Sequence, residues 1–365
     1  MTSPRRLPIV LVALALLVGA CSSGGSTSTS GSTSTAPHGS TARSGVTTTS
    51  RTEGGGKAKA KPAAVGTYAV GLASFAFEDP SRSTPANGTY EAHPGRKLPV
   101  LAWYPSGTKG PGGGKVPDAV KGAQPGPGHF PVIIFSHGVT GKATFYNAPL
   151  RAWASAGYVV VAPDYPLSNL DAPGGPTVID VGQQPADASF VLDQFVGPAA
   201  KRPPATATLA AHVDAAHIAA VGHSLGAITS LGIGYGTCCV DDRIDAVAEF
   251  AGIVLALQNK PSPDPKVTDR PLLIIHGTKD GTVVYKNGED TFAKVKVPRW
   301  FITLPDAPHI PPYLIGRSGP QPTVVVDATL DFLDAELKGD TAGIDRMEAV
   351  VAKAGPKVAT IKSAG

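Results

Sequence analysis

The pentapeptide Gly222-His223-Ser224-Leu225-Gly226 places a serine between two glycines. A serine hydroxyl attacks a carbonyl carbon only when a neighbouring base removes its proton. An apolar run precedes this segment and helix-favouring residues follow it, which predicts a sharp turn from a strand into a helix. The two glycines let the chain pass closely through such a turn, and the start of the helix favours developing negative charge. The serine is therefore predicted to be a nucleophile.

A base and an acid for this serine follow two later apolar runs. Asp280 lies in the loop after the run Leu272–His276, and His309 comes shortly after the run Trp300–Leu304. A histidine removes the serine proton when a carboxylate accepts a hydrogen bond from its ring and orients it. His309 is the only histidine after Asp280, so we predict this pair. Glu249, at the end of an earlier apolar run, is the alternative acid.

Attack on a carbonyl group places negative charge on its oxygen, which needs two fixed N–H donors. One predicted donor is the amide of Leu225, directly after the serine. The other is expected from the loop His137–Gly141, which follows the apolar run Val132–Ser136. Together these groups predict acyl transfer to water. This chemistry needs no cofactor, and we expect none.

Apolar runs and amphipathic stretches alternate along residues 67–340. Apolar runs rich in Val and Ile are typical of strands buried on both faces of a sheet, and the stretches between them are typical of helices. The predicted strands are Thr67–Phe77, Leu98–Tyr104, Val132–Ser136, Val159–Ala162, Ile218–Val221, Ala246–Ala251, Leu272–His276 and Trp300–Leu304. The predicted helices are Tyr146–Ala156, Pro185–Val196, Leu225–Tyr235, Lys286–Val295 and Thr323–Leu337. The alternation predicts an α/β fold with a mostly parallel, twisted central sheet and helices on both faces.

Residues 1–20 combine a basic start, an apolar run and small residues, which is typical of a cleaved export signal. The apolar run Leu7–Val18 is short for a transmembrane helix. Residues Val18–Cys21 resemble a bacterial lipobox, which implies cleavage before Cys21 and acylation of that cysteine. Several acyl chains give stable anchoring in a membrane. We therefore expect an exported lipoprotein that Cys21 holds on the extracytoplasmic face of the cell membrane.

The composition divides the rest of the chain into three parts. Residues 21–66 are rich in Ser, Thr and Gly with few apolar residues, which predicts a flexible tether. Residues 67–340 form the predicted domain, within which the Gly- and Pro-rich segment Lys109–His129 is expected to be a loop. Residues 341–365 are polar and small, which predicts a tail with at most one weak helix.

Charge and cysteine content bound the classes of partner. The net charge is +4, part of it in the tether, so the predicted domain is near neutral and has no basic stripe for nucleic acid. Apart from Cys21, the cysteines are the adjacent pair Cys238 and Cys239, which is compatible with a disulfide or with two free thiols. No cysteines and histidines have the spacing of a metal site, so we expect no metal.

Five segments of this chain resemble α/β-hydrolases, most closely the branch of dienelactone hydrolases, platelet-activating-factor acetylhydrolases and bacterial polyester hydrolases. They are Ser136–Gly138, Ala162–Tyr165, Gly222–Gly226, His276–Asp280 and His309. The resemblance covers about residues 68–337 and implies the α/β-hydrolase fold. The surroundings of His309 are richer in proline than is usual in that superfamily.

The resemblance implies Ser224 as nucleophile, Asp280 as acid and His309 as base, with backbone donors at Val139 and Leu225. It implies a serine hydrolase that cuts carboxylic ester bonds through an acyl-enzyme. The segments that could cover the site are short and rich in proline and glycine, so we expect short-chain or exposed esters and lipids as substrates. The alternatives are a polyester hydrolase, a peptidase on the same fold, and a lipid-anchored binding protein without catalysis.

Overall fold

The computed structural model describes residues 64–267, 269–310, 313 and 318–365. The predicted signal, the lipidation site Cys21 and nearly all of the tether lie outside the described residues. Within the described part, no helix has both the length and the apolar character needed to cross a bilayer.

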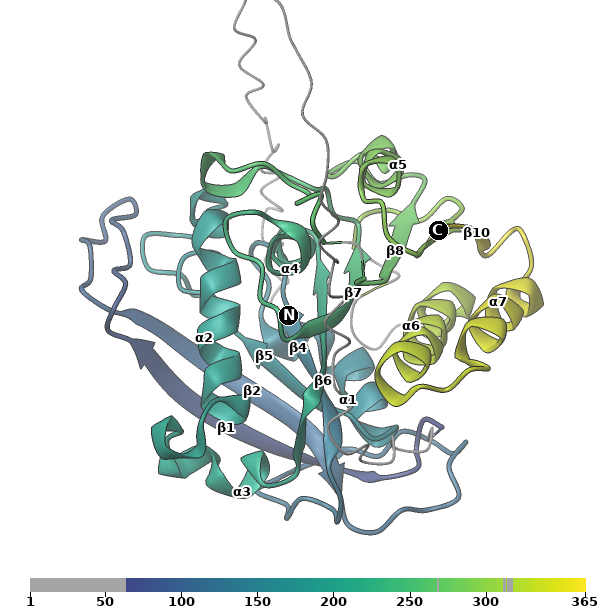
Figure 1. Ribbon diagram of the computed structural model, residues 1–365, viewed down its shortest axis with the longest axis horizontal. Helices are drawn as coiled ribbons and strands as arrows, with labels where there is room; N and C mark the ends of the chain where they lie inside the picture. Colours follow the sequence, from purple (N-terminus) through teal and green to yellow (C-terminus); the bar gives the residue numbers. More distant parts are fainter. Residues whose placement is uncertain (1–63, 268, 311–312, 314–317) are drawn as a thin grey trace, which may run out of the picture. The chain divides into compact units, whose positions relative to one another are not determined.

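The described chain forms a ten-stranded sheet in the order β10-β9-β8-β7-β6-β4-β5-β2-β1-β3 (Figure 1). The strands are β1 (Ala69–Asp79), β2 (Arg96–Ser106), β3 (Ala119–Lys121), β4 (Phe130–Ser136), β5 (Val159–Pro163), β6 (Val213–His223), β7 (Ile244–Phe250), β8 (Leu272–Gly277), β9 (Arg299–Leu304) and β10 (Thr360–Ala364). Strands β4 to β9 run parallel to one another, while β2 and β10 pair antiparallel with their neighbours. This arrangement confirms the predicted α/β fold with a mostly parallel sheet.

Helices cover both faces of this sheet (Figure 1). They are α1 (Asn147–Ser155), α2 (Gln184–Val196), α3 (Ala207–Ala210), α4 (Leu225–Tyr235), α5 (Tyr285–Lys294), α6 (Pro320–Lys338) and α7 (Gly343–Ala354). Short 3₁₀ turns are η1 (Ala143–Tyr146), η2 (Ile179–Gln183), η3 (Ala199–Lys201), η4 (Pro204–Thr206) and η5 (Leu257–Asn259). One core packs α1, α6 and α7 against the sheet, and the other packs α2, α4 and α5 against it. Every residue of β4, β5 and β8 is buried, as their continuous apolar sequences require.

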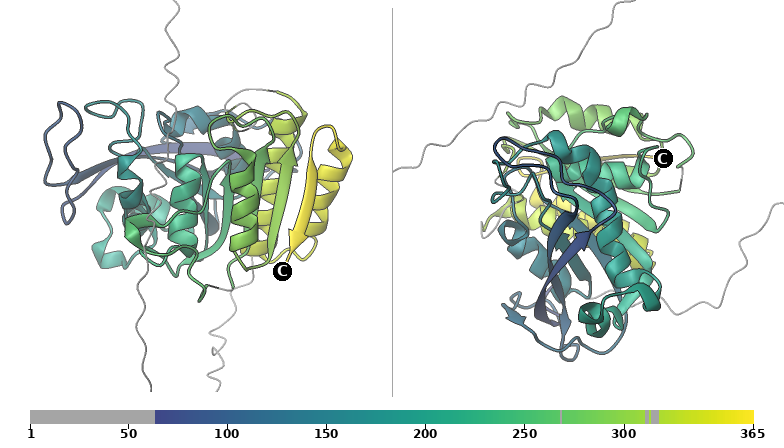
Figure 2. Two further views of the ribbon diagram at one scale, coloured as in Figure 1. Left: turned by 90° about the horizontal axis from the view of Figure 1, so that it is seen from above. Right: turned by 90° about the vertical axis from the view of Figure 1, so that its left-hand side faces the viewer.

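Two segments differ from the sequence-based expectation. The predicted loop 109–129 contains β3, which pairs in parallel with β1. The predicted tail 341–365 contains α7, which buries Met347 and Val351, and then β10, which pairs with β9. Strands β3 and β10 therefore lie at the two ends of the sheet (Figure 2). Strands β3 and β10 are short edge strands that pair through their backbones, so their side chains show little alternation of apolar and polar residues.

A buried ion cluster ties β2 to the segment that follows β5. The guanidinium of Arg96 is wholly buried, and it donates to Asp187 at 2.5 and 2.7 Å and to Asp180 at 2.8 and 3.1 Å. Asp180 lies in η2 and Asp187 in α2. The cluster therefore holds the start of α2 against the antiparallel half of the sheet.

We expect Arg96→Ala to lower the free energy of unfolding by about 3–5 kcal/mol, because it leaves the buried Asp180 without a cation and Asp187 with Arg82 alone. Urea unfolding measures this loss. The control is Lys286→Ala, since the side chains of Lys286 and its partner Asp290 are 67% and 40% exposed and their ion pair lies at the surface. That change should leave the free energy of unfolding nearly unchanged. Equal losses in the two variants would contradict the role given to Arg96.

Candidate active site

Ser224 lies in the sharp turn between β6 and α4. Its backbone has φ 56° and ψ −120°, a conformation that is costly for any residue with a side chain. A Cβ added to Gly222 would lie 2.2 Å from the carbonyl oxygen of Gly226, and one added to Gly226 would lie 2.0 Å from that of Ser136. Neither glycine can therefore carry a side chain without displacing the turn. This is the close backbone approach that the Gly-x-Ser-x-Gly spacing predicts.

The turn is held by backbone hydrogen bonds to the neighbouring strand and to the helix. The Ser224 amide donates to the Phe250 carbonyl at 2.9 Å, and the Ser224 carbonyl accepts from the Ala227 amide at 2.9 Å. Because Phe250 ends β7, the serine is fixed at the carboxyl edge of the parallel strands. Its side chain is 6% exposed.

The structure brings three predicted residues from separate loops into one hydrogen-bonded row. His309 Nε2 lies 2.8 Å from Ser224 Oγ, and His309 Nδ1 lies 2.6 Å from Asp280 Oδ2. A carboxylate accepts but does not donate, so Nδ1 carries the ring hydrogen and Nε2 is left to accept from the serine hydroxyl. Ser224 follows β6, Asp280 follows β8 and His309 follows β9. This arrangement can remove the serine proton.

Asp280 is held as an anion by donors on both of its oxygens. Oδ1 accepts from the amides of Thr282 and Val283 at 2.9 and 2.8 Å. Oδ2 faces His276 Nε2 at 3.3 Å in addition to His309. Burial alone would raise the pKa of Asp280, but hydrogen bonds from His276 and His309 outweigh it and hold the pKa well below its usual range. No role for His276 was predicted from the sequence; the one signal was its position four residues before Asp280.

Glu249, the alternative acid, is buried close by but is not hydrogen-bonded to His309. Its Oε2 accepts from the Gly252 amide at 2.8 Å, and its Oε1 has no hydrogen-bond partner within the described ranges. Burial raises the pKa of Glu249 to about 7. The structure therefore brings Asp280, and not Glu249, to the histidine.

The raised pKa of Glu249 predicts a pH-dependent stability. The pKa in the folded protein, about 7, exceeds the ordinary value of 4.5, so the stabilisation is complete below pH 4.5 and is lost as the pH rises through 7. In Glu249→Gln the neutral amide can still accept from Gly252. We therefore expect urea unfolding to show this variant gaining stability relative to the wild type between about pH 5 and about pH 8. A difference that does not change with pH would contradict the assignment.

The loop after β4 lies directly against the serine. A Cβ added to Gly138 would lie 3.1 Å from the Cβ of Ser224. His137, wholly buried, donates from Nδ1 to the Gly138 carbonyl at 2.7 Å and accepts at Nε2 from the Tyr165 amide at 3.0 Å. The Thr140 amide donates to the Ser168 carbonyl at 2.8 Å. The loop is therefore fixed by its own hydrogen bonds before any substrate is bound.

The two predicted oxyanion donors are neighbours beside the serine. Leu225 is the first residue of α4, so its amide has no carbonyl one turn earlier in the helix to bond. Val139 is half-buried and packs in the same apolar cluster as Leu225. Amides at these two residues could stabilise negative charge on a bound carbonyl oxygen.

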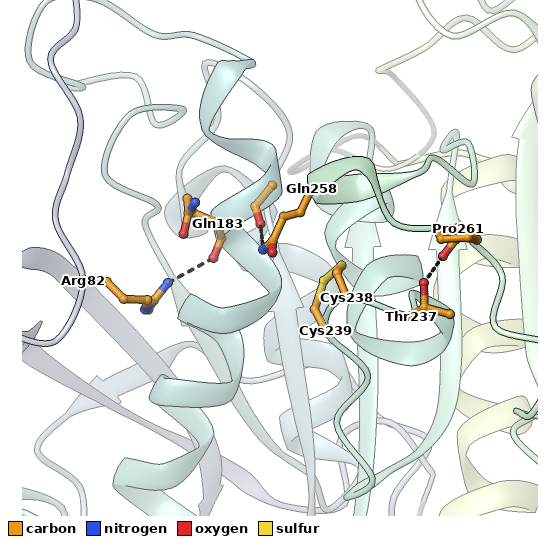
Figure 3. The surroundings of a disulfide bond; sticks show 8 residues. Arg82, Gln183, Thr237, Cys238, Cys239, Gln258 and Pro261 are labelled. Carbon is orange, nitrogen blue, oxygen red and sulfur yellow. Dashed lines mark hydrogen bonds between the residues drawn. A yellow bond between two sulfur atoms is a disulfide. The ribbon is translucent and has the colours of Figure 1, made fainter.

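An apolar cluster extends from these residues to a disulfide. Its members are Leu225, Ile228 and Leu257, with Val139, Val178, Val181, Cys238, Ile253 and Leu255 packed against them. Cys238 and Cys239, whose pairing the sequence left open, are joined by a disulfide (Figure 3). Beside it, Thr237 Oγ1 donates to the Pro261 carbonyl at 2.5 Å and Gln258 Nε2 donates to the Gly182 carbonyl at 2.7 Å (Figure 3). The segment after α4 is therefore tied to the loop around η5, and that loop is tied to η2.

Comparison with known proteins places the fold. Residues 120–254 match the Chlorophyllase family model. Over 126 residues the chain is 29% identical to Chlorophyllase-1 of Arabidopsis thaliana, which is 34% of this chain and 35% of that protein. The match thus spans about a third of the curated relative.

A ferulic acid esterase from Streptomyces cinnamoneus has a similar structure, with a TM-score of 0.57 and 22% sequence identity. The similarity covers 78% of this chain and 94% of the esterase. The family match includes the loop after β4 and Ser224, and the structural match supplies the fold of the whole sheet. By its sheet order, its strand-turn-helix at Ser224 and this structural likeness, the chain has the α/β-hydrolase fold.

Proposed function

We propose that this protein is a serine hydrolase that cleaves carboxylic ester bonds through an acyl-enzyme. The observation that carries the proposal is the double hydrogen bonding of His309, which meets Ser224 Oγ at 2.8 Å and Asp280 Oδ2 at 2.6 Å. Similarity to a chlorophyllase and to a ferulic acid esterase favours esters over peptides as substrates.

In the proposed mechanism, Ser224 Oγ attacks the ester carbonyl carbon while His309 Nε2 takes its proton. The negative charge on the carbonyl oxygen is met by the amides of Val139 and Leu225, and Asp280 stabilises the imidazolium. His309 then gives the proton to the leaving alcohol, and the acyl group stays on Ser224. In the second half His309 deprotonates water, which attacks the acyl carbon; the bond to Ser224 Oγ breaks, His309 returns the proton to Oγ, and the carboxylic acid is released.

The test is a panel of p-nitrophenyl esters from acetyl to dodecanoyl, run beside peptide p-nitroanilides. We expect ester turnover that is highest for the short chains, because the site has no long helical cover in the described chain. Cleavage of peptides without cleavage of esters would replace the proposal with a peptidase. Failure of a fluorophosphonate to label Ser224 would favour a binding protein without catalysis.

We also propose that the enzyme acts outside the cell, anchored in the membrane by acyl chains on Cys21. The sequence of residues 1–21 and the Ser/Thr/Gly-rich segment after it support this location. In cells given a clickable palmitate analogue, the wild type should carry the label and partition into detergent. Cys21→Ser should lose both properties, and a labelled Cys21→Ser protein would contradict the anchor.

A further inference from the structure

Tyr146 and His223 form a buried link between the loops of the site. Tyr146 ends η1, just before α1, and His223 is the last residue of β6, directly before Ser224. Each is only 3% exposed. The mechanism above uses neither side chain, yet both lie within hydrogen-bond distance of site loops.

The donors of these hydrogen bonds all point one way, from the loop His137–Gly141, called the oxyanion loop here, to the loop that carries His309. The Gly138 amide lies 3.2 Å from the Tyr146 hydroxyl, which lies 2.7 Å from His223 Nδ1. His223 Nε2 lies 3.0 Å from the carbonyl oxygen of His309. A carbonyl only accepts, so His223 Nε2 carries the hydrogen and Nδ1 is free to accept from the tyrosine. The tyrosine oxygen in turn accepts from Gly138, so every group has one role.

Near neutral pH, His223 stays uncharged and the Tyr146 hydroxyl keeps its proton, so the directions of these hydrogen bonds do not change. Burial and, less strongly, the nearby charge of His309 lower the pKa of His223 to about 3. Asp280 raises this pKa and His276 lowers it, both by smaller amounts. Burial raises the pKa of the Tyr146 hydroxyl, so this group keeps its proton. The ring of His223 lies 4.9 Å from the ring of His309, centroid to centroid. A neutral His223 therefore adds no like charge beside the imidazolium that forms during attack.

We propose that Tyr146 and His223 are positioning residues. Through the hydrogen bonds from Gly138 to Tyr146, His223 and the His309 carbonyl, they fix the loop that carries His309 relative to the oxyanion loop. The inference rests on the proposed function, because it concerns the placement of that function's base and amide donors. The segment around His309 is rich in proline and has few amide donors with which to tie itself down. Displacing a reacting group by about 1 Å can cost about 10²-fold in rate.

The test is Tyr146→Phe, which removes one oxygen and leaves His223 Nδ1 and the Gly138 amide without a partner. We expect kcat per titrated active site to fall about 10-fold with KM within about 2-fold, which is the rate loss expected if one of the two lost hydrogen bonds contributes to placing the reacting groups. The second-order rate of Ser224 labelling by a fluorophosphonate should fall in parallel. This labelling needs no knowledge of the natural substrate.

The matched control is Tyr235→Phe. The Tyr235 hydroxyl is also buried and donates to the Arg270 carbonyl at 2.8 Å, at the opposite end of α4 from Ser224. Both variants should lose similar melting temperature, but Tyr235→Phe should keep the wild-type kcat. Equal labelling rates in Tyr146→Phe and in the wild type would overturn the inference. A wild type that the probe does not label would overturn the proposed function, and the inference with it.

A second pair of variants tests the bond to His309 directly. His223→Gln keeps an N–H donor near the position of Nε2, whereas His223→Leu removes both hydrogen bonds at similar size. We expect His223→Gln to retain at least about 10-fold more kcat than His223→Leu, by the same one-bond arithmetic. Equal kcat values in two folded variants would show that filling the space is sufficient, and would overturn the positioning role.

Discussion

Replacing Ser224 by alanine is expected to reduce ester turnover by a factor of about 10⁵, because no other group in the row can form the acyl-enzyme. The free energy of unfolding should change by about 1 kcal/mol or less. Within the described residues the serine hydroxyl makes one side-chain hydrogen bond, to His309. An alanine in the same backbone conformation, with its positive φ, has about the same conformational energy as the serine. Hydrolysis of a short p-nitrophenyl ester and thermal unfolding of the same samples measure the two effects.

The control for Ser224→Ala is Ser230→Ala. Ser230 lies in α4 and is 1% exposed, and its hydroxyl has no hydrogen-bond partner within the described residues. Removing that hydroxyl should leave turnover unchanged. If Ser224→Ala instead kept its activity and lost more than about 3 kcal/mol of stability, the serine would be a structural residue that caps the turn.

The meeting of Ser224, Asp280 and His309 was predictable because each follows a strand that the sequence marks clearly. The runs Ile218–Val221 and Leu272–Ile275 are continuous and apolar, which is typical of parallel strands buried on both faces, and the run before His309 is apolar except for Thr303. Parallel strands end at one edge of the sheet, so the loops after them converge there. The close approach at Gly226 was predictable for the same reason, since a helix must start within a few residues of the strand.

The features that were not predicted depend on side chains or backbones far apart in the sequence. Strand β10 pairs with β9 through backbone groups, and its residues Thr360, Lys362 and Ser363 show no apolar alternation. The bond from Tyr146 to His223 spans 77 residues, and either residue could equally be an ordinary core side chain. The periodicity of apolar residues along the sequence gives no information on such distant pairs, so they become visible only in the folded chain.

Replacing Asp280 by asparagine is expected to lower kcat by about 10⁴-fold, because the amide then fails to hold His309 in the right tautomer. Every group around this carboxylate is a donor: two backbone amides on Oδ1, and the rings of His309 and His276 on Oδ2. Whichever way the asparagine is turned, its NH₂ group faces two of these donors. Rotation of the amide therefore cannot recover the arrangement, and stability should fall as well.

Comparison with Glu249→Gln separates the two candidate acids. Glu249 is wholly buried and its Oε2 accepts from the Gly252 amide and not from His309, so its neutral amide should keep kcat within about 10-fold of the wild type. Steady-state kinetics with a short p-nitrophenyl ester, normalised to fluorophosphonate-titrated sites, measure both variants. The reverse result, with Asp280→Asn active and Glu249→Gln inactive, would move the acid to the end of β7. It would also require His309 to turn away from a carboxylate that lies 2.6 Å from its ring nitrogen.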